Sequence, residues 1–407
     1  MKEKRIIIVG GGASGLVAAI TAARIGADVT IIEQKDRLGK KILSTGNGRC
    51  NLTNEYMELK CFRGDDTAIV SEVLEQFGYE KTLEFFGELG VLTKNRQGYI
   101  YPISDQATTI LDVLRMEIKK WDIKTILEES VLDVKKTKKG FLVKTNKNTY
   151  TSDVVILASG GKASPVLGSD GSGYGLAKSF GHTLSPVVPA LVQLRGKGNY
   201  FKQLSGIRTN AAVSLYVNNT FVDSDTGELQ LTNYGISGIP VFQISRFAAK
   251  AIYYKQNVIV NINFMPTMTE NEFSIFIRER RKLHGFKSME NFFVGVFHKK
   301  LIGVFLKEAN IPLHITADSL TDLQWNRLFH TIYHFRIEIE GTNSFEQAQV
   351  CAGGVRTSEI HHKTMESKYQ KDLYLTGELL DIDGICGGYN LQWAWATGYL
   401  AGKNAAK

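Results

Sequence analysis

The chain has 407 residues, of which 43% are hydrophobic and 22% charged, and these proportions exclude a disordered or fibrous protein. Its 49 lysines and arginines outnumber its 41 acidic residues and leave a net charge of +8, but they are scattered, so we expect no nucleic-acid partner. Four cysteines without a CxxC pair, no signal peptide and no apolar run of membrane-spanning length predict a cytoplasmic protein without a membrane span.

The N-terminal segment predicts a strand, a helix and a second strand in a parallel arrangement. Residues 5–9 (RIIIV) form a continuous apolar run, which is typical of a strand buried on both faces of a sheet. Residues 13–26 carry small and apolar side chains at helical spacing, and residues 28–33 (DVTIIE) predict the second strand. The pattern therefore indicates a βαβ unit.

Helical and strand patterns follow in separate blocks. Residues 68–90 predict two helices divided near Gly78, and residues 106–122 predict another amphipathic helix. Residues 130–161 alternate apolar and polar side chains, which predicts a small antiparallel sheet whose last strand (DVVILA) is wholly apolar and buried.

The βαβ pattern is interrupted in the middle of the chain and returns near its end. We therefore expect one nucleotide-binding domain made from both ends of the chain, with another domain inserted between them. The expected boundaries are 1–190 and 346–407 for the nucleotide-binding domain and 191–345 for the inserted domain, which is β-rich over 191–268 and about 338–345 and helical over 269–337.

Three glycines after the first strand form a dinucleotide-binding motif. Gly10, Gly12 and Gly15 stand as GxGxxG, where they allow a tight turn, a close approach of a pyrophosphate and close packing of helix on strand. Glu33 ends the second strand, where a carboxylate can accept both hydroxyls of an adenosine ribose. A coincidental glycine-rich turn is the alternative, and Glu33 disfavours NADP because a 2′-phosphate would face its charge.

Two later segments indicate a flavin rather than a nicotinamide cofactor. VVILASGG (154–161) resembles the strand-plus-glycine signature of two-dinucleotide-type flavoproteins, and LYLTGELLD (373–381) resembles their last strand. A helix starting at GGYNLQ (387–392) would direct its donors at the flavin's pyrimidine edge and stabilise the negative charge of reduced flavin. A Schellman-type glycine turn before an amphipathic helix is the structural alternative.

Several motifs together resemble one family of bacterial proteins. GRCNLTN, GSDGSGYGLAKSFGH, TNYGISGIPVFQISR, CAGGV and GELLDIDGICGGYNLQWAWATG are similar to the BaiN/YhiN-type flavoproteins, also described as NAD(P)/FAD-dependent or aminoacetone-oxidase-like oxidoreductases. The resemblance implies an α/β fold: a two-dinucleotide-type Rossmann-like FAD domain with an inserted β-rich plus helical domain. It is weakest over 270–340.

The motifs and the resemblance together predict where FAD binds. The expected cofactor-binding residues are Gly10, Gly12, Ala13, Ser14, Gly15, Glu33, Gln34, Lys40, Lys41, Thr45, Gly46, Asn47, Arg49, Cys50, Asn51, Val131, Ala158, Ser159, Gly160, Gly377, Glu378, Asp383, Gly387, Gly388, Tyr389, Asn390 and Leu391.

The resemblance leaves the reaction open between three alternatives. The first is a reductase that takes a hydride from NAD(P)H and reduces an unsaturated or carbonyl-conjugated substrate, such as a 3-oxo bile-acid steroid. The second is an oxidase of a small amine such as aminoacetone that uses O₂. The third is a flavin-bound binding or regulatory module. GSDGSGYG (168–175) does not complete a second dinucleotide motif, so NAD(P)H would bind only transiently.

No catalytic acid or base is predicted from the sequence. Cys50 beside Arg49 could be a reactive thiolate, and Cys386 invites the same idea, but packing beside the cofactor is the favoured interpretation for both. The eight histidines form no ligand box, so no metal is expected, and His182 is interpreted as structural. The expected partner is a small-molecule substrate, and the oligomeric state stays open.

Overall fold

The computed structural model describes residues 3–407 and divides the chain into two compact units. The first unit combines both ends of the chain, Met1–Pro189 and Phe345–Lys407. The second unit is the continuous segment Ala190–Ser344. Each unit has its own hydrophobic core.

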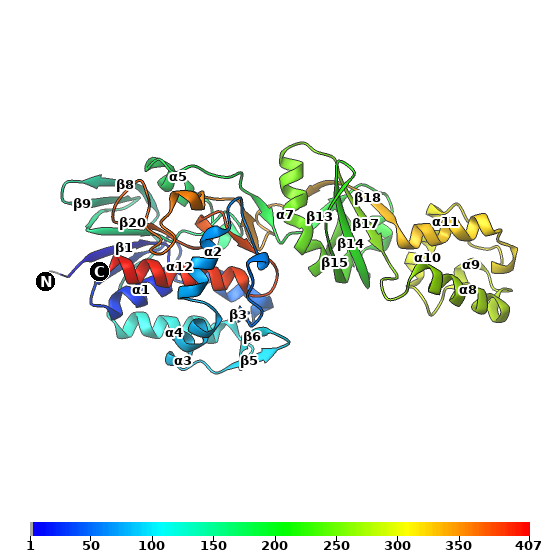
Figure 1. Cartoon of the computed structure of the whole chain (residues 1–407), viewed down its shortest axis with the longest axis horizontal. Coiled ribbons are helices and arrows are strands. Elements are labelled where there is room, and N and C mark those ends of the chain that lie inside the picture. Colours follow the sequence, from blue (N-terminus) through cyan, green and yellow to red (C-terminus); the bar gives the residue numbers. More distant parts are fainter. Residues whose placement is uncertain (1–2) are drawn as a thin grey trace. The chain divides into compact units, whose positions relative to one another are not determined.

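A five-stranded parallel sheet forms the centre of the first unit (Figure 1). Its strand order is β20-β11-β1-β2-β7, so strands from the two ends of the chain are neighbours. The register places Ile8 between Ile156 and Ile31, and all three side chains are fully buried. The bounds are β1 (Arg5–Val9), β2 (Asp28–Ile32), β7 (Lys124–Ile126), β11 (Val154–Leu157) and β20 (Leu373–Leu375).

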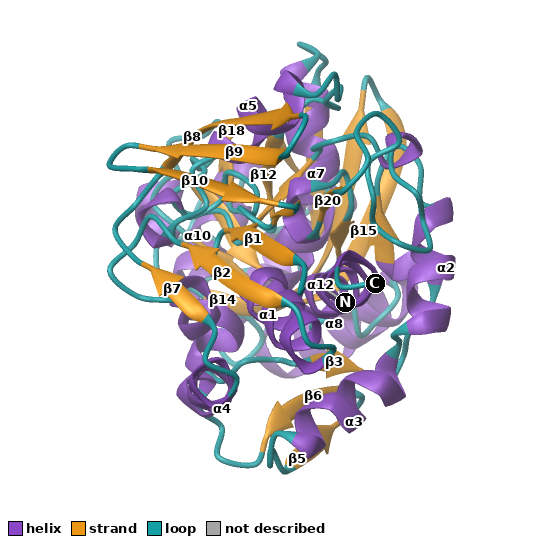
Figure 2. Cartoon of the chain, turned by 90° about the vertical axis from the view of Figure 1, so that its left-hand side faces the viewer, coloured by secondary structure: helices purple, strands orange, loops and turns teal. Residues whose placement is uncertain are grey.

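The two faces of this sheet carry different elements (Figure 2). Helices cover one face and a three-stranded antiparallel sheet of order β10-β9-β8 covers the other. The bounds are α1 (Ala13–Arg24), α4 (Ala107–Lys120), α12 (Tyr389–Ala405), β8 (Val131–Thr137), β9 (Gly140–Thr145) and β10 (Thr149–Ser152).

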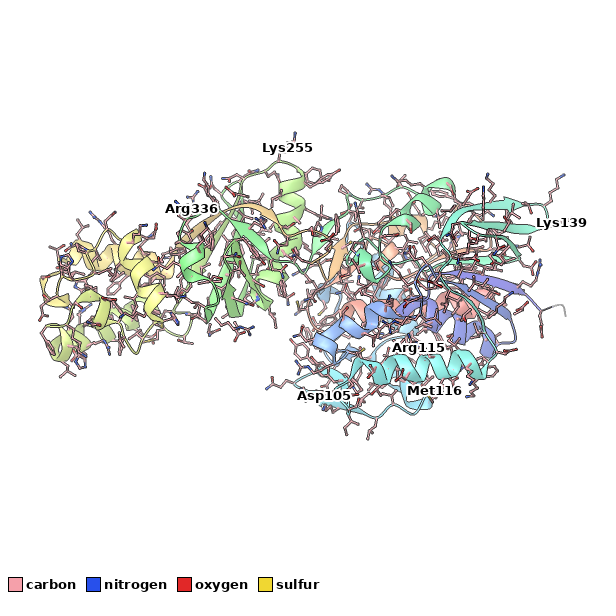
Figure 3. All side chains as sticks on the ribbon, turned by 180° about the vertical axis from the view of Figure 1, so that it is seen from behind. Asp105, Arg115, Met116, Lys139, Lys255 and Arg336 are labelled. Carbon is pink, nitrogen blue, oxygen red and sulfur yellow. The ribbon has the colours of Figure 1, made fainter. Side chains whose placement is uncertain are left out.

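Helix α4 is amphipathic and packs on the core with its apolar side. Ile110, Leu111 and Leu114 are buried against the core, whereas Met116 on the other side is 64% exposed. Arg115, labelled beside Met116 in Figure 3, donates from Nη2 to the carbonyl oxygen of Leu38 at 2.6 Å.

Helices α1 and α12 approach each other closely enough to exclude side chains. A Cβ atom at Gly398 would collide with the carbonyl oxygen of Ser14, and one at Gly402 with that of Ala18. The two glycines are four residues apart, on one face of α12, so they form a smooth stripe against the backbone of α1.

Shorter elements complete the first unit. They are β3 (Thr53–Asn54), β4 (Phe62–Arg63), β5 (Thr93–Arg96), β6 (Tyr99–Pro102), β12 (Val188–Ala190), β19 (Val350–Ala352), β21 (Asp383–Gly384), α2 (Ala68–Gln76), α3 (Tyr79–Glu88), α5 (Ser172–Ser179) and the 3₁₀ helices Lys40–Gly48, Leu59–Cys61, Pro165–Leu167, Thr357–Glu359 and Gly377–Leu379.

The second unit contains a closed six-stranded barrel of order β13-β16-β15-β14-β17-β18. Its inward positions alternate along the strands, as in β14, where Ala211, Val213 and Leu215 are fully buried. The bounds are β13 (Leu194–Gly196), β14 (Arg208–Val217), β15 (Thr220–Leu231), β16 (Gly235–Gly238), β17 (Val258–Asn263) and β18 (Phe335–Thr342).

Helices of the second unit pack through an aromatic cluster. Capping boxes start two of them, Thr269 with Glu272 at α8 and Thr321 with Gln324 at α11. Phe273 contacts the rings of several other aromatic residues in edge or tilted geometry. The bounds are α6 (Phe201–Leu204), α7 (Ile239–Tyr253), α8 (Glu270–His284), α9 (Met289–Phe292), α10 (Lys299–Glu308), α11 (Asp322–Tyr333) and the 3₁₀ helix Ala317–Ser319.

The predicted fold class is confirmed: a Rossmann-type parallel sheet accompanies an additional β-rich and helical part. One helix lies where the sequence predicted strands. Helix α7 lies within the stretch expected to be mostly strands, and its buried Val241, Ile244 and Ala248 follow helical spacing after Pro240 in the first turn. Across residues 3–407, no helix meets the length and hydropathy that a membrane crossing requires.

Candidate functional site

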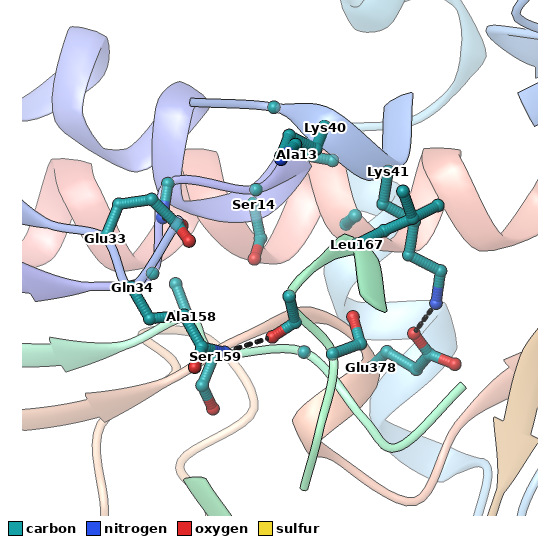
Figure 4. A pocket seen from close by; sticks show the side chains of 18 of the residues that line it. Ala13, Ser14, Glu33, Gln34, Lys40, Lys41, Ala158, Ser159, Leu167 and Glu378 are labelled. Carbon is teal, nitrogen blue, oxygen red and sulfur yellow. Dashed lines mark hydrogen bonds and ion pairs between the residues drawn. The ribbon is translucent and has the colours of Figure 1, made fainter. Parts of the chain in front are cut away.

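A cavity of about 360 Å³ lies in the first unit, at the carboxyl ends of β1, β2 and β11. Its wall includes the turn after β1, the residues after β2 and β11, and the first residues of α12. Figure 4 shows Ser14, Glu33, Ser159 and Glu378 around it. Crevices at this edge of open α/β sheets are where such folds bind ligands.

The glycine turn between β1 and α1 leaves its backbone open to the cavity. Gly10 has φ +103°, and a Cβ there would meet the carbonyl oxygen of Ala158 at 2.5 Å. A Cβ on Gly15 would collide with the carbonyl oxygen of Gly10, whereas one on Gly12 would have no atom within 4 Å. Gly12 is also the N-cap of α1, which has no side-chain cap and no acidic residue in its first turn. These features fit a bound pyrophosphate.

Glu33 is held in place by backbone donors at the end of the cavity next to this turn. Its Oε2 accepts from the N–H of Gly11 at 2.8 Å and its Oε1 from the N–H of Lys35 at 2.9 Å. The residue is 8% exposed, and burial raises the pKa of its carboxyl group above the ordinary value although these two donors oppose the shift. Each oxygen keeps a second lone pair, so the group can accept further hydroxyl donors.

Ser159 offers the cavity a polar group that is not used within the protein. Its Oγ is buried and has no hydrogen-bond partner among the described residues. Gly173, in the first turn of α5, leaves room for it, since a Cβ there would overlap the Ser159 Oγ. A buried hydroxyl without a partner in a cavity wall fits a polar ligand, because an unsatisfied buried group costs about 1–3 kcal/mol.

An ion pair stands on another part of the wall. Lys41 Nζ lies 2.8 Å from Glu378 Oε2, as the dashed line in Figure 4 shows. The other oxygen, Oε1, accepts from the N–H of Cys351 at 2.6 Å. Glu378 is thereby fixed in the 3₁₀ helix that follows β20 in the C-terminal part of the chain, facing a lysine from the N-terminal part.

The start of α12 provides the remaining donors. Asn390 and Leu391 line the cavity, and the first turn of α12 contains no acidic residue. Asn390 is fixed to β21 because its side chain both donates to and accepts from the backbone of Gly384 at 2.8 Å. Close by, the buried Oδ1 of Asn51 has no partner among the described residues. A helix start without acidic residues suits a ligand edge that carries negative charge.

The cavity brings together sixteen of the residues expected from the sequence, and these come from both ends of the chain. They are Gly10, Gly12, Ala13, Ser14, Glu33, Gln34, Lys40, Lys41, Thr45, Val131, Ala158, Ser159, Gly160, Glu378, Asn390 and Leu391.

The other expected residues do not border this cavity, for two physical reasons. Residues of one group are buried or packed against other residues of the protein, and residues of the other group are exposed in the 40–51 segment. The first group is Gly15, Cys50, Asn51, Gly377, Asp383, Gly387, Gly388 and Tyr389, and the second is Gly46, Asn47 and Arg49.

Sequence reasoning missed wall residues that arrive through tertiary contacts. Some adjoin expected residues, as Gly11 adjoins Gly12. Others come from loops with no local signal. Residues 168–175 contribute to the family resemblance and form an incomplete second dinucleotide motif, but neither observation predicts contact with this cavity. The missed residues include Val9, Gly11, Ile32, Arg37, Gly39, Ile42, Glu129, Ser130, Leu132, Leu167, Gly168, Ser169, Asp170, Ser172, Leu176, Gln349, Val350, Ile382, Trp393 and Ala394.

Cys50 has the environment of a structural thiol. It is fully buried, and burial raises its pKa to about 12, which the hydroxyl of Thr45 only partly opposes. The thiol is therefore protonated at neutral pH and is a poor nucleophile. Burial likewise raises the pKa of Cys351, whereas Cys386 is partly exposed. Within residues 3–407 there is no group of three or more acidic, histidine or cysteine residues suited to a metal ion.

The family model for the HI0933-like protein Rossmann domain matches residues 4–404. The chain belongs to the HI0933-like family. This match agrees with the resemblance to the BaiN/YhiN-type flavoproteins, which is confirmed.

Two characterised relatives of this HI0933-like protein span its whole length. The 3-dehydro-bile acid delta(4,6)-reductase of Clostridium scindens is 52% identical over 405 residues, which are 99% of each chain. The ribosomal RNA dihydrouridine synthase of Escherichia coli is 28% identical over 408 residues, covering 99% of this chain and 98% of that protein.

Solved structures show the same fold at low sequence identity. The open conformation of a flavocytochrome c3 fumarate reductase has a TM-score of 0.51 at 16% identity and covers 100% of this chain and 78% of that one. The 3-ketosteroid delta1-dehydrogenase of Sterolibacterium denitrificans, in complex with 1,4-androstadiene-3,17-dione, also has a TM-score of 0.51, at 12% identity, and covers 100% of both chains. The family match and the reductase relative confirm the prediction that the protein is an oxidoreductase.

Proposed function

We propose that this HI0933-like protein is an FAD-dependent reductase of a carbon–carbon double bond conjugated with a carbonyl, with a 3-oxo bile acid as its substrate. The observation that carries the proposal is the 52% identity, over 99% of both chains, to a 3-dehydro-bile acid delta(4,6)-reductase. The cavity supports it, because its wall suits an extended cofactor with phosphates.

In this proposal the first unit is the FAD domain and the second is an inserted domain. Glu33 would accept from the adenosine ribose, and the start of α1 would hold the pyrophosphate. Ser159 and Glu378 would address the ribityl hydroxyls, and Lys41 and the start of α12 the flavin. FAD supplies hydride transfer at the flavin N5 when it is bound.

The chain's own contribution would be electrostatic. The N–H groups at the start of α12 would face the pyrimidine edge of a bound flavin, where they would stabilise the negative charge of its reduced form. We propose NAD(P)H as the hydride source. With only one GxGxxG motif in the sequence, it would bind transiently.

A second candidate substrate is a uridine in RNA. The E. coli relative is named a ribosomal RNA dihydrouridine synthase, and the uracil ring also contains a double bond conjugated with a carbonyl. This candidate departs from the expectation that the protein has no nucleic-acid partner. The supporting observation is that Ala190–Ser344 carries 17 lysines and arginines but only 12 acidic residues, so +5 of the net +8 lies on the second unit. The lower identity ranks it second.

An anaerobic donor and acceptor screen tests these proposals. The purified holoenzyme is mixed with NADH, NADPH or aminoacetone, and bleaching of the flavin is recorded. The reduced enzyme is then mixed with a 3-oxo-Δ4,6 bile acid, with uridine-containing ribosomal RNA, or with O₂. We expect bleaching by NAD(P)H and fast recovery of colour with the bile acid. Bleaching by aminoacetone alone, with recovery only by O₂, would establish the oxidase alternative instead.

A further inference from the structure

Strand β6 presents two tyrosines on one side. Ile100 is 2% exposed and Pro102 is buried, whereas Tyr99 is 40% exposed and Tyr101 is half-buried. Side chains at alternate positions of a strand point to the same face, so the two tyrosine rings form an aromatic surface turned away from the core.

At two places this aromatic surface contacts residues that lie close in sequence to the wall of the cavity. A Cβ on Gly387 would lie 3.2 Å from Tyr99 Cε1, and Gly387 comes three residues before the cavity-lining Asn390. A Cβ on Gly46 would lie 3.6 Å from Tyr101 Cε1, and Gly46 directly follows the cavity-lining Thr45. The rings therefore lie between the loop at residues 44–51 and the start of α12.

An arginine without a carboxylate partner stands beside this surface. The Arg49 guanidinium carbon lies 5.8 Å from the centre of the Tyr101 ring, and the residue is exposed. No acidic group among residues 3–407 forms an ion pair with Arg49. On the same ring, Arg96 lies at 5.7 Å but is paired with Asp105 at 2.7 Å.

The difference between the two arginines decides which one is available to a ligand. Asp105, labelled in Figure 3, is also paired with Lys94, and Lys94 is the largest influence that lowers the pKa of its carboxyl group. Arg96 is therefore in direct ion-pair contact with a carboxylate, whereas Arg49 makes no ion pair with the described residues and is only the weakest of the three cations that lower the pKa of Asp105. An exposed guanidinium held over a ring presents its planar donors to a carboxylate or phosphate.

We propose that Tyr99, Tyr101 and Arg49 form a substrate-binding surface, on which a flat ring system lies against the tyrosines and an anionic group of the substrate pairs with Arg49. The proposal rests on the function proposed above and names the residues that would recognise the substrate. Arg49, which the sequence analysis expected to bind FAD, would bind the substrate instead. The anion is the side-chain carboxylate of a bile acid or, for the second candidate, a phosphate of RNA.

The test compares an acid with its neutral ester in the holoenzyme. KM is measured for a 3-oxo-Δ4,6 bile acid and for its methyl ester with wild type, Arg49→Ala and the matched control Arg96→Ala. Because one charge-assisted pair is lost, we expect Arg49→Ala to raise the ratio of KM for the acid to KM for the ester roughly tenfold. Arg96→Ala is expected to leave this ratio within about twofold, and Arg49→Lys to restore part of it. The ratio cancels any effect of the variants on FAD binding.

Other outcomes separate this inference from the proposed function. An unchanged ratio in Arg49→Ala, with wild type turning over both substrates, overturns the inference alone. If wild type turns over neither substrate, the bile-acid function fails. The affinity of Arg49→Ala for a uridine-containing RNA then decides: a weaker affinity with a smaller salt dependence supports Arg49 as the anion contact, and an unchanged affinity overturns it.

Discussion

Replacing Gly12 with alanine should impair FAD binding while leaving the folded protein intact. A Cβ at Gly12 would meet no atom within 4 Å, and its φ of −81° and ψ of −166° are open to alanine. The loss of a good N-cap and the lower entropy of the unfolded chain have opposite signs, and each is about 1 kcal/mol or less. The stability of the apoprotein should therefore change by less than about 1 kcal/mol.

The effect of the same Cβ on FAD should be larger. It would stand where the pyrophosphate approaches the backbone, and a lost hydrogen bond to a charged group weakens binding by about 1.5–3 kcal/mol. The dissociation constant of FAD should therefore rise between about tenfold and a hundredfold, measured by titrating apoprotein with FAD and following quenching of flavin fluorescence.

Gly15→Ala is the matched control in the same turn. Its Cβ would collide with the carbonyl oxygen of Gly10, so this variant should lose about 1–3 kcal/mol of stability together with FAD affinity. Thermal denaturation of both apoproteins separates the two effects. If Gly12→Ala binds FAD as tightly as wild type, the pyrophosphate does not lie against this turn and the assignment is wrong.

Three further predictions concern buried groups. Glu33→Arg should lower FAD affinity at least about tenfold in the same titration, because the ribose loses its acceptor; an unchanged affinity would contradict the ribose role. Under native conditions iodoacetamide should label Cys386 and spare Cys50, whose buried thiol has its pKa raised to about 12, and mass mapping of a modified Cys50 would refute this. Burial lowers the pKa of His182 although the nearby Glu359 opposes the shift. Below about pH 6.5 the unfolded chain therefore binds a proton at this histidine more readily than the folded chain does. Stability should then fall by up to about 1.4 kcal/mol per pH unit as the pH decreases, and His182→Asn should flatten the pH dependence of urea unfolding midpoints; an equally steep dependence in that variant would exclude His182 as its source.

Local patterns were sufficient to predict much of the first unit. The run RIIIV, the glycines after it and Glu33 lie within about thirty residues, and their contacts are set by the geometry of one βαβ unit. The same holds for the division of α2 and α3 near Gly78, which is the N-cap of α3. In such cases spacing along the sequence determines spacing in the structure.

Contacts between distant segments could not be predicted in this way. Closure of the barrel depends on the pairing of β13 with both β16 and β18, which no local period encodes. The burial of Cys50 and the exposure of Arg49, its neighbour, depend on which way one left-handed turn directs each side chain. Gln349 and Val350 line the cavity at the start of β19, which pairs with the distant β12 and contacts β21, and no local pattern encodes these contacts.

The close packing of α1 against α12 has a consequence for the order in which the protein assembles during synthesis. A chain emerging from the ribosome contains β1 and α1 early, but α12, which packs on α1, and β20, the edge strand of the same sheet, emerge only after residues 373–405 have been translated. The intervening Ala190–Ser344 is continuous and has its own core, so it can fold first. The cavity wall needs segments from both ends, and the cofactor therefore finds a complete site only after the rest of the protein has been made.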